Sequence, residues 1–220
     1  CNSTPFTAAA EFSPKKEDYP AYMAPDAENY RGIHAVKVLT ELQGKLNLDS
    51  FLELAYDPYL PAFQYLVPEL LGAYQSGASS EGVKQALELL RNWDLKTSKE
   101  SVAMSLAHFY GENYQRKFRS MNRFINEMPN AKVPSSRELK EVFEGTLVQM
   151  NSDFGSWNTP WGEINRFQRL SGDIDAGFDD SKPYVPVGLA SGNWGALAAY
   201  GARTTENTKR LYGYRGNSFV

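Results

Sequence analysis

The side chains best suited to catalysis are few in this chain. It has two histidines, His34 and His108, and one cysteine, Cys1. A nucleophilic hydroxyl or thiol needs a base beside it, yet the sequence contains no G-x-S-x-G, H-E-x-x-H, C-x-x-C or P-loop pattern. The two histidines fall on different predicted helices. We therefore interpret each as an ordinary helix residue, and spacing alone reveals no reaction.

Two further segments have residue types that could hold ligands. The acidic cluster Asp173, Asp175, Asp179 and Asp180 offers hard oxygen ligands, but it lacks the glycine placement and distal glutamate of an EF-hand loop. We interpret it as an exposed acidic loop. The glycine-rich run 188–201 lacks the lysine and the strand-then-helix context of a phosphate loop. It is predicted to be a plain loop, and we expect no cofactor and no metal.

Composition excludes several classes of protein. The 220 residues are 42% hydrophobic and 13% aromatic, which is enough for a packed core. The net charge of −3 and the pI of about 5.5 argue against a nucleic-acid partner, which requires a basic surface. No apolar run approaches the roughly 20 residues that span a bilayer. We therefore expect no transmembrane segment.

The chain divides into three parts by pattern. Residues 1–24 contain Pro5, Pro14 and Pro20 and are predicted to be an extended segment. Residues 25–155 are predicted to form a helical subdomain, and residues 156–220 an irregular segment with β-strands. Apolar residues at 35, 38, 39 and 42 have helical spacing. Capping-box patterns predict three more helix starts. These pairs are Ser50 and Glu53, Thr97 and Glu100, and Ser135 and Glu138.

Strands are expected near the C-terminal end. After Gly155 the residues Gly, Pro, Asp and Asn become frequent, and short strands are predicted within 184–189 and 210–220. The predicted fold class is therefore α+β, mainly helical with short C-terminal strands. Because the last residues look like the opening of a strand, we expect a fragment of a longer chain.

Two segments resemble a known family. The run Cys1-Asn2-Ser3-Thr4-Pro5-Phe6 resembles the N-x-x-P motif of the penicillin acylase family, closest to the aculeacin and acyl-homoserine-lactone acylase branch. Residues 29–39 resemble the family helix that begins an R-A-x-R-I pattern, with Arg31 at the first arginine and His34 at the second basic position. Weaker likenesses cover 90–106 and the stretch around Trp161-Gly162.

The resemblance implies a role for two residues. Asn2 matches the asparagine that supplies the oxyanion hole, and Arg31 matches an arginine that positions the substrate. An amide N–H held in advance stabilises the tetrahedral intermediate, and losing one such donor costs on the order of 10²–10³ in rate. Arg31 also lies near a predicted helix N-terminus, where the helix dipole disfavours a cation. This placement indicates that Arg31 has a role other than stabilising the helix.

The resemblance also implies the organisation of the enzyme. Members of the family are N-terminal-nucleophile hydrolases with an αββα fold, in which the first residue of the mature β-chain attacks and its own α-amine is the base. We expect the N-terminal part of the same precursor, the α-chain and the start of the β-chain, to be this chain's partner. The implied substrate is a linear amide such as a penicillin, an acyl-homoserine lactone or a lipopeptide. The implied location is periplasmic or secreted, and the isolated fragment should be inactive and expose an apolar face.

Two alternatives start from Cys1. If Cys1 is a true mature N-terminus, it could be the nucleophile of a cysteine-type relative of this family. Against this, strands should follow the nucleophile, whereas prolines follow Cys1. Alternatively, Cys1 followed by polar residues is typical of a lipid-anchored bacterial lipoprotein. The remainder would then be a helical binding protein at a membrane surface.

Overall fold

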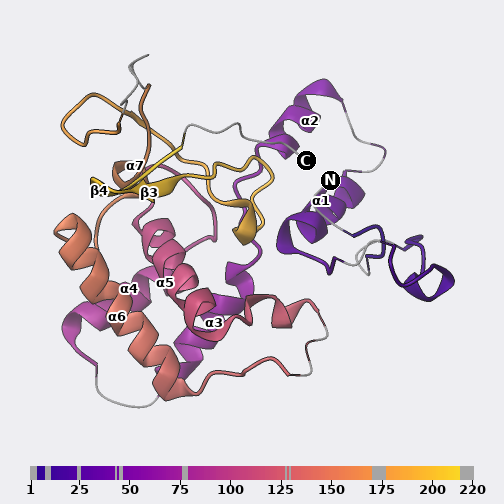
Figure 1. The fold of residues 1–220 in the computed structure, drawn as a ribbon, viewed down its shortest axis with the longest axis horizontal. Coiled ribbons are helices and arrows are strands. Elements are labelled where there is room, and N and C mark those ends of the chain that lie inside the picture. The colour runs from indigo at the N-terminus through magenta and orange to yellow at the C-terminus, as the bar shows by residue number, and fades with distance from the viewer. Residues whose placement is uncertain are drawn as a thin grey trace.

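A computed structural model of the chain describes residues 4–7, 11–23, 26–42, 44, 47–75, 79–126, 128, 130–169 and 177–213. Within these ranges the fold is α+β, as predicted, with helices first and a small sheet near the C-terminal end (Figure 1). The α-helices are α1 (Tyr30–Glu41), α2 (Leu48–Ala55), α3 (Phe63–Ala73), α4 (Glu81–Arg91), α5 (Val102–Phe118), α6 (Ser136–Phe154) and α7 (Trp161–Ile164). Short 3-10 helices are η1 (Lys16–Asp18), η2 (Met121–Phe124) and η3 (Gly192–Trp194).

Helix α5 is the centre of a helical body that α3, α4 and α6 complete. It is buried all round from Ala103 to Gly111, which is typical of a helix inside a core. Tyr110 and Tyr114 of α5 and Phe143 of α6 are completely buried. In Figure 1, α1 and α2 lie to one side of this body.

The sheet has the order β2-β1-β4-β3, with β1 (Asn165–Phe167), β2 (Val185–Pro186), β3 (Arg203–Thr205) and β4 (Thr208–Tyr212). Strand β1 pairs antiparallel with β2 and parallel with β4, and β3 pairs antiparallel with β4. The predicted segment 184–189 contains β2. The segment 210–220 includes the end of β4, and its residues 214–220 lie outside the described ranges. Strands β1 and β3 were not predicted because three residues each are too short to show a period.

The predicted helix starts have mixed outcomes. The capping box of Ser135 and Glu138 is confirmed, with the Ser135 hydroxyl accepting from the Glu138 amide at 3.3 Å. The prediction for Ser50 is wrong, because Asn47 caps α2 and Ser50 is the third helical residue. The prediction for Thr97 is also wrong. Helix α5 starts after Ser101, while the Thr97 hydroxyl donates to the carbonyl of Gly188 instead.

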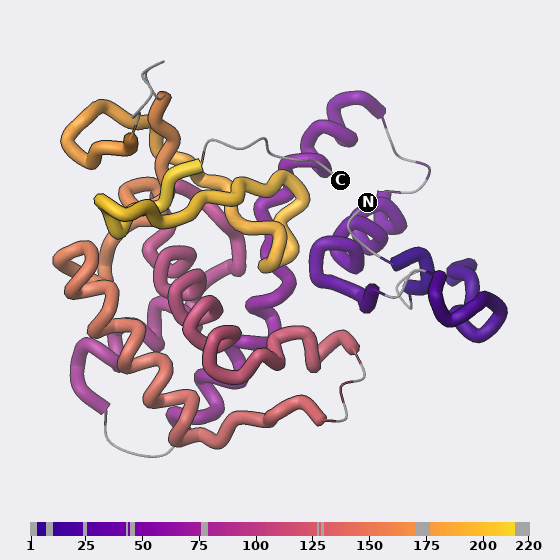
Figure 2. Tube along the Cα trace, viewed as in Figure 1, coloured from indigo at the N-terminus to yellow at the C-terminus, as the bar shows by residue number. Residues whose placement is uncertain are grey.

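The segment that contains η3 joins the two regions of the molecule. Figure 2 shows the C-terminal part of the chain crossing the helical body toward α1. There η3 packs against α1, and the Ala62 amide before α3 donates to the Trp194 carbonyl at 3.2 Å. Residues far apart in the sequence are thus brought to one place.

Candidate functional site

Arg31 occupies the first turn of α1. The Asn29 side chain caps this helix by accepting from the Gly32 amide at 2.8 Å. The Arg31 side chain turns inward, and the residue is only 4% exposed. Its Nη2 donates to the Leu197 carbonyl at 2.7 Å. Arg31 is therefore not a solvent-exposed surface arginine. Burial lowers the pKa of Arg31, but a guanidinium keeps its charge in proteins.

A small cavity of about 250 Å³ lies beside Arg31. Its lining comes from the start of α1, from η2 and from η3. The residues are Asn29, Tyr30, Arg31, Met121, Asn122, Gly192 and Asn193. A Cβ added at Gly192 would lie 3.4 Å from Arg31 Cδ, so a glycine lets the loop approach the arginine closely. The cavity offers amide groups next to a buried cation.

The start of α1 is anchored to the helical body. The Tyr30 hydroxyl donates to the Met121 carbonyl at 2.7 Å, and burial raises the pKa of that phenol. The Asn126 amide group donates to the Glu28 carbonyl at 2.8 Å. These two contacts fix where the Arg31 side chain begins.

The N-terminal segment meets the same region. Thr4 is buried, and the Thr7 hydroxyl donates to the carboxylate of Glu28, three residues before Arg31. Cys1 and Asn2 lie outside the described residues. The oxyanion role of Asn2 therefore stays a prediction, as do both alternatives that start from Cys1.

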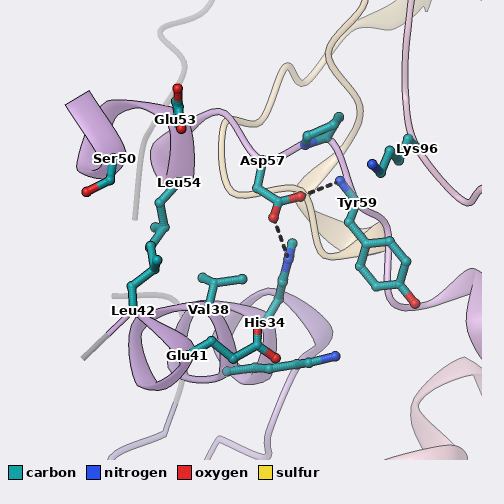
Figure 3. Close-up of a pocket in the computed structure, with 12 residues that line it drawn as sticks. His34, Val38, Glu41, Leu42, Ser50, Glu53, Leu54, Asp57, Tyr59 and Lys96 are labelled. Carbon is teal, nitrogen blue, oxygen red and sulfur yellow. Dashed lines mark hydrogen bonds and ion pairs between the residues drawn. The ribbon is translucent and has the colours of Figure 1, made fainter. Parts of the chain in front are cut away.

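His34 lies one turn after Arg31 and is 3% exposed. Its Nδ1 is 2.8 Å from the Gly195 carbonyl oxygen. Because a carbonyl oxygen only accepts, Nδ1 carries the hydrogen. Its Nε2 faces Asp57 Oδ2 at 3.8 Å, and the other Asp57 oxygen accepts from the Tyr59 amide at 2.8 Å (Figure 3). His34 is thus held between a loop and a carboxylate.

A groove of about 520 Å³ opens between α1 and α2. In Figure 3, Val38 of α1 and Leu42, directly after α1, face Leu54 of α2 across it, with His34 and Asp57 at one end. Charged residues surround this apolar floor. They are Lys37, Glu41, Glu53 and Lys96. The groove therefore offers an apolar slot with a polar rim.

Gly195 makes the loop geometry possible. Its φ is +96°, and a Cβ there would lie 2.4 Å from Pro61 Cγ. Only glycine fits both conditions. The run 188–201 is a loop, as its sequence predicts, but the sequence does not indicate that carbonyls of this loop accept from Arg31 and His34. The glycine at 195 was the one local signal, because the partners lie about 160 residues apart in the chain.

The acidic cluster is only partly described, since Asp173 and Asp175 lie outside the described residues. Asp180 accepts from the hydroxyls of Thr208 and Tyr212 at 2.7 Å and lies 3.7 Å from Arg210 Nε. It ties its loop to β4. In the described part of the chain, no three His, Cys, Asp or Glu side chains are grouped as a metal would require.

Neither histidine is placed as a base for a hydroxyl nucleophile. In the described ranges, His34 contacts Gly195 and Asp57, and His108 accepts from the Trp194 indole.

Among the described helices, none is long and apolar enough to cross a membrane.

The fold and the site define an α+β protein in which a buried arginine at a helix start holds a glycine-rich loop. The sequence profile of the penicillin amidase family matches residues 2–220. The chain therefore belongs to the penicillin amidase family, a family of amide hydrolases. No curated protein sequence matches the chain.

Proposed function

We propose that this chain supplies the oxyanion hole and the substrate-positioning elements of an N-terminal-nucleophile hydrolase that deacylates a linear amide. The observation that carries the proposal is the buried Arg31, bonded to Leu197 and lining a cavity close to where the N-terminal segment docks at Glu28. Asn2 stands two residues before the buried Thr4. The resemblance to the aculeacin and acyl-homoserine-lactone acylase branch supports the same roles.

In this mechanism the attack on the scissile carbonyl creates a negative oxygen. The Asn2 side-chain amide donates to that oxygen, and it acts only if it is held in place before the reaction. Arg31 is a positioning residue, because its guanidinium holds Leu197 and borders the cavity. His34, one turn further along α1, is also a positioning residue, because it holds the Gly195 carbonyl.

The groove between α1 and α2 is proposed to receive the acyl group. Val38, Leu42 and Leu54 give it an apolar floor, and an acyl chain placed there would leave water. Burial of each methylene contributes about 0.8 kcal/mol. A linear acyl amide, such as an acyl-homoserine lactone or a lipopeptide, suits an apolar floor with a polar rim.

The nucleophile is proposed to come from another part of the same precursor. This accords with histidines that have no hydroxyl partner in the described ranges. On this proposal the isolated chain is inactive. Residues 1–24 carry the oxyanion asparagine, residues 25–155 provide the helices of the acyl pocket, and residues 156–220 complete the sheet of the parent enzyme. The family supports a periplasmic or secreted location.

Substitution of Arg31 tests the positioning role. In the mature enzyme that contains this chain, Arg31→Ala should lower kcat/KM for a chromogenic acyl anilide about 100-fold, since small misplacements near the reacting atoms cost that much. The kcat/KM of Arg31→Lys should lie between those of the wild type and Arg31→Ala, because lysine keeps the charge but lacks the planar guanidinium. Arg137, exposed on α6, provides the control as Arg137→Ala. Equal kcat/KM for the Arg31 and Arg137 variants would contradict the proposal.

A further inference from the structure

The short helix η2 contributes part of the wall of the cavity beside Arg31. Met121 and Asn122, the first two residues of η2, both line that cavity. A 3-10 helix of four residues has little stability of its own, because its hydrogen-bond geometry is poor. The place of η2 in the molecule must therefore be set by its contacts with longer elements.

An ion pair joins η2 to α3. The Arg123 Nη2 donates to Glu69 Oε1, and the two side chains are only 10% and 17% exposed. Arg123 Nε and Nη1 are buried without a hydrogen-bond partner among the described residues. A buried pair with incomplete hydrogen bonding contributes little to stability, because the cost of removing two charges from water offsets their attraction. Stability alone does not account for this pair.

Aromatic rings continue the contact between η2 and α3. The Arg123 guanidinium lies 3.9 Å from the centre of the Phe124 ring. Phe124 stacks on Tyr65 of α3, with ring centroids 5.3 Å apart and an interplanar angle of 15°. Tyr65 and Glu69 are four residues apart, so they lie on the same face of α3. A slip of η2 by one residue would break the ring contact and the ion pair together, so the two contacts fix its register.

Tyr30 connects η2 to the start of α1. Its ring packs against Tyr65 with centroids 6.0 Å apart, and its hydroxyl donates to the Met121 carbonyl at 2.7 Å. Of the described α1 residues, only Tyr30 belongs to the main hydrophobic core, whereas Ala35 belongs to a separate small cluster. The next residue is Arg31. A displacement of η2 would therefore move the acceptor of Tyr30 and, with it, the start of α1.

We propose that Glu69 and Arg123 are positioning residues, which set the place of Arg31 through η2 and Tyr30. The inference rests on the proposed function, in which Arg31 positions the substrate. Neither Glu69 nor Arg123 lines the cavity itself. The ion pair serves the geometry of the site, because it fixes both the η2 wall of the cavity and the residue before Arg31.

Apolar replacement of the pair separates position from stability. The double variant Glu69→Leu with Arg123→Met puts apolar side chains in place of both charges, a change that often leaves stability unaltered or higher. In the mature enzyme that contains this chain, its urea midpoint should stay near the wild-type value. Its kcat/KM for a chromogenic acyl anilide should nevertheless fall about 10-fold, less than for Arg31→Ala, because Arg31 is displaced but still present.

A second ion pair provides the matched control. Lys117 of α5 and Glu141 of α6 lie 3.3 Å apart and also join two elements. Lys117→Met with Glu141→Leu should leave kcat/KM unchanged. Wild-type kcat/KM in the folded Glu69 and Arg123 double variant would overturn the proposal.

The effect of the pair must also depend on Arg31. If Glu69 and Arg123 act through that residue, their double variant should lower kcat/KM less than about 2-fold when it is made in the Arg31→Ala protein. A further 10-fold loss in that protein would mean that the pair acts independently of Arg31, and the proposal would fall.

The position of Arg31 can be followed without catalysis. In mature protein labelled with 15N-arginine, the side-chain Nε–H signal of Arg31 is assigned by its loss in Arg31→Lys. This signal should shift in the Glu69 and Arg123 double variant, shift less in Arg123→Lys, which keeps the charge, and stay in place in the Lys117 and Glu141 control. An unchanged signal in the first double variant would overturn the proposal. If the signal shifts but Arg31→Ala keeps wild-type kcat/KM, the pair does position Arg31, and it is the proposed function of Arg31 that fails.

Discussion

Arg31 and His34 stand one turn apart on α1, and each engages a carbonyl of the same loop. Arg31 donates to Leu197 and His34 to Gly195. The sequence indicated Arg31 through its resemblance to a family helix, and it placed His34 at the second basic position. It could not indicate that both side chains are buried or which carbonyls they reach, because those partners come from a loop about 160 residues away.

His108 should give the protein a specific pH dependence. Its pKa falls from 6.5 to about 3 on folding, so between these values the unfolded chain binds the extra proton. The free energy of unfolding contributed by His108 is therefore fully present above pH 6.5 and is lost as pH falls toward 3. The slope approaches about 1.4 kcal/mol per pH unit within the window.

The measurement is urea unfolding at several pH values between 4 and 7 for the wild type and for His108→Gln. Glutamine accepts from Trp194 but does not titrate. The variant should therefore lose stability less steeply as the pH falls. Identical slopes for the two proteins would show that His108 is not the buried neutral group described above.

At the scale of elements, the loop after η3 is the part on which the site depends. Helices α1 and α6 were predictable because their apolar spacing and, for α6, the Ser135 cap are local signals. The starts of α2 and α5 were misplaced by a few residues, since several Ser, Thr and Asn residues near each start satisfy the same pattern. The loop has only Gly195 as a local signal, and that glycine does not define its conformation, because Pro61, Tyr30 and Arg31 pack against the loop from elsewhere in the chain.

Gly195→Ala tests how tightly this loop is constrained. The added methyl must occupy a backbone with φ of +96° and meets Pro61 at 2.4 Å. We expect a loss of about 2 kcal/mol or more in the free energy of unfolding. Gly201→Ala is the matched control, because its Cβ meets no atom within 4 Å, and it should change stability by less than about 0.5 kcal/mol. Equal effects of the two substitutions would refute the constraint.

For the whole molecule, α2 carries an apolar stripe that the described structure leaves exposed. The stripe consists of Leu48, Phe51 and Leu52 and continues to Tyr56, directly after the helix; these residues follow helical spacing and are 75%, 47%, 50% and 52% exposed. The sequence led us to expect such a face, although it did not indicate which helix would carry it. Exposed apolar stripes favour association.

We expect the isolated 220-residue chain to self-associate through this stripe. Replacing both Leu48 and Leu52 with lysine should shift sedimentation toward the monomer. Asp49→Lys changes the net charge by the same +2 on the same helix and should leave association nearly unaltered. A wild-type chain that stays monomeric at high concentration would contradict the expectation.

We propose that this chain supplies the oxyanion hole of an amide hydrolase, and measuring kcat of Asn2→Ala in the mature enzyme is the sharpest test of that role. Ser3→Ala serves as the neighbouring control. We expect kcat for a chromogenic acyl anilide to fall on the order of 10²–10³-fold in Asn2→Ala, with KM little changed and Ser3→Ala near wild type. If folded Asn2→Ala has the same kcat as the Ser3→Ala control, Asn2 does not supply the oxyanion hole.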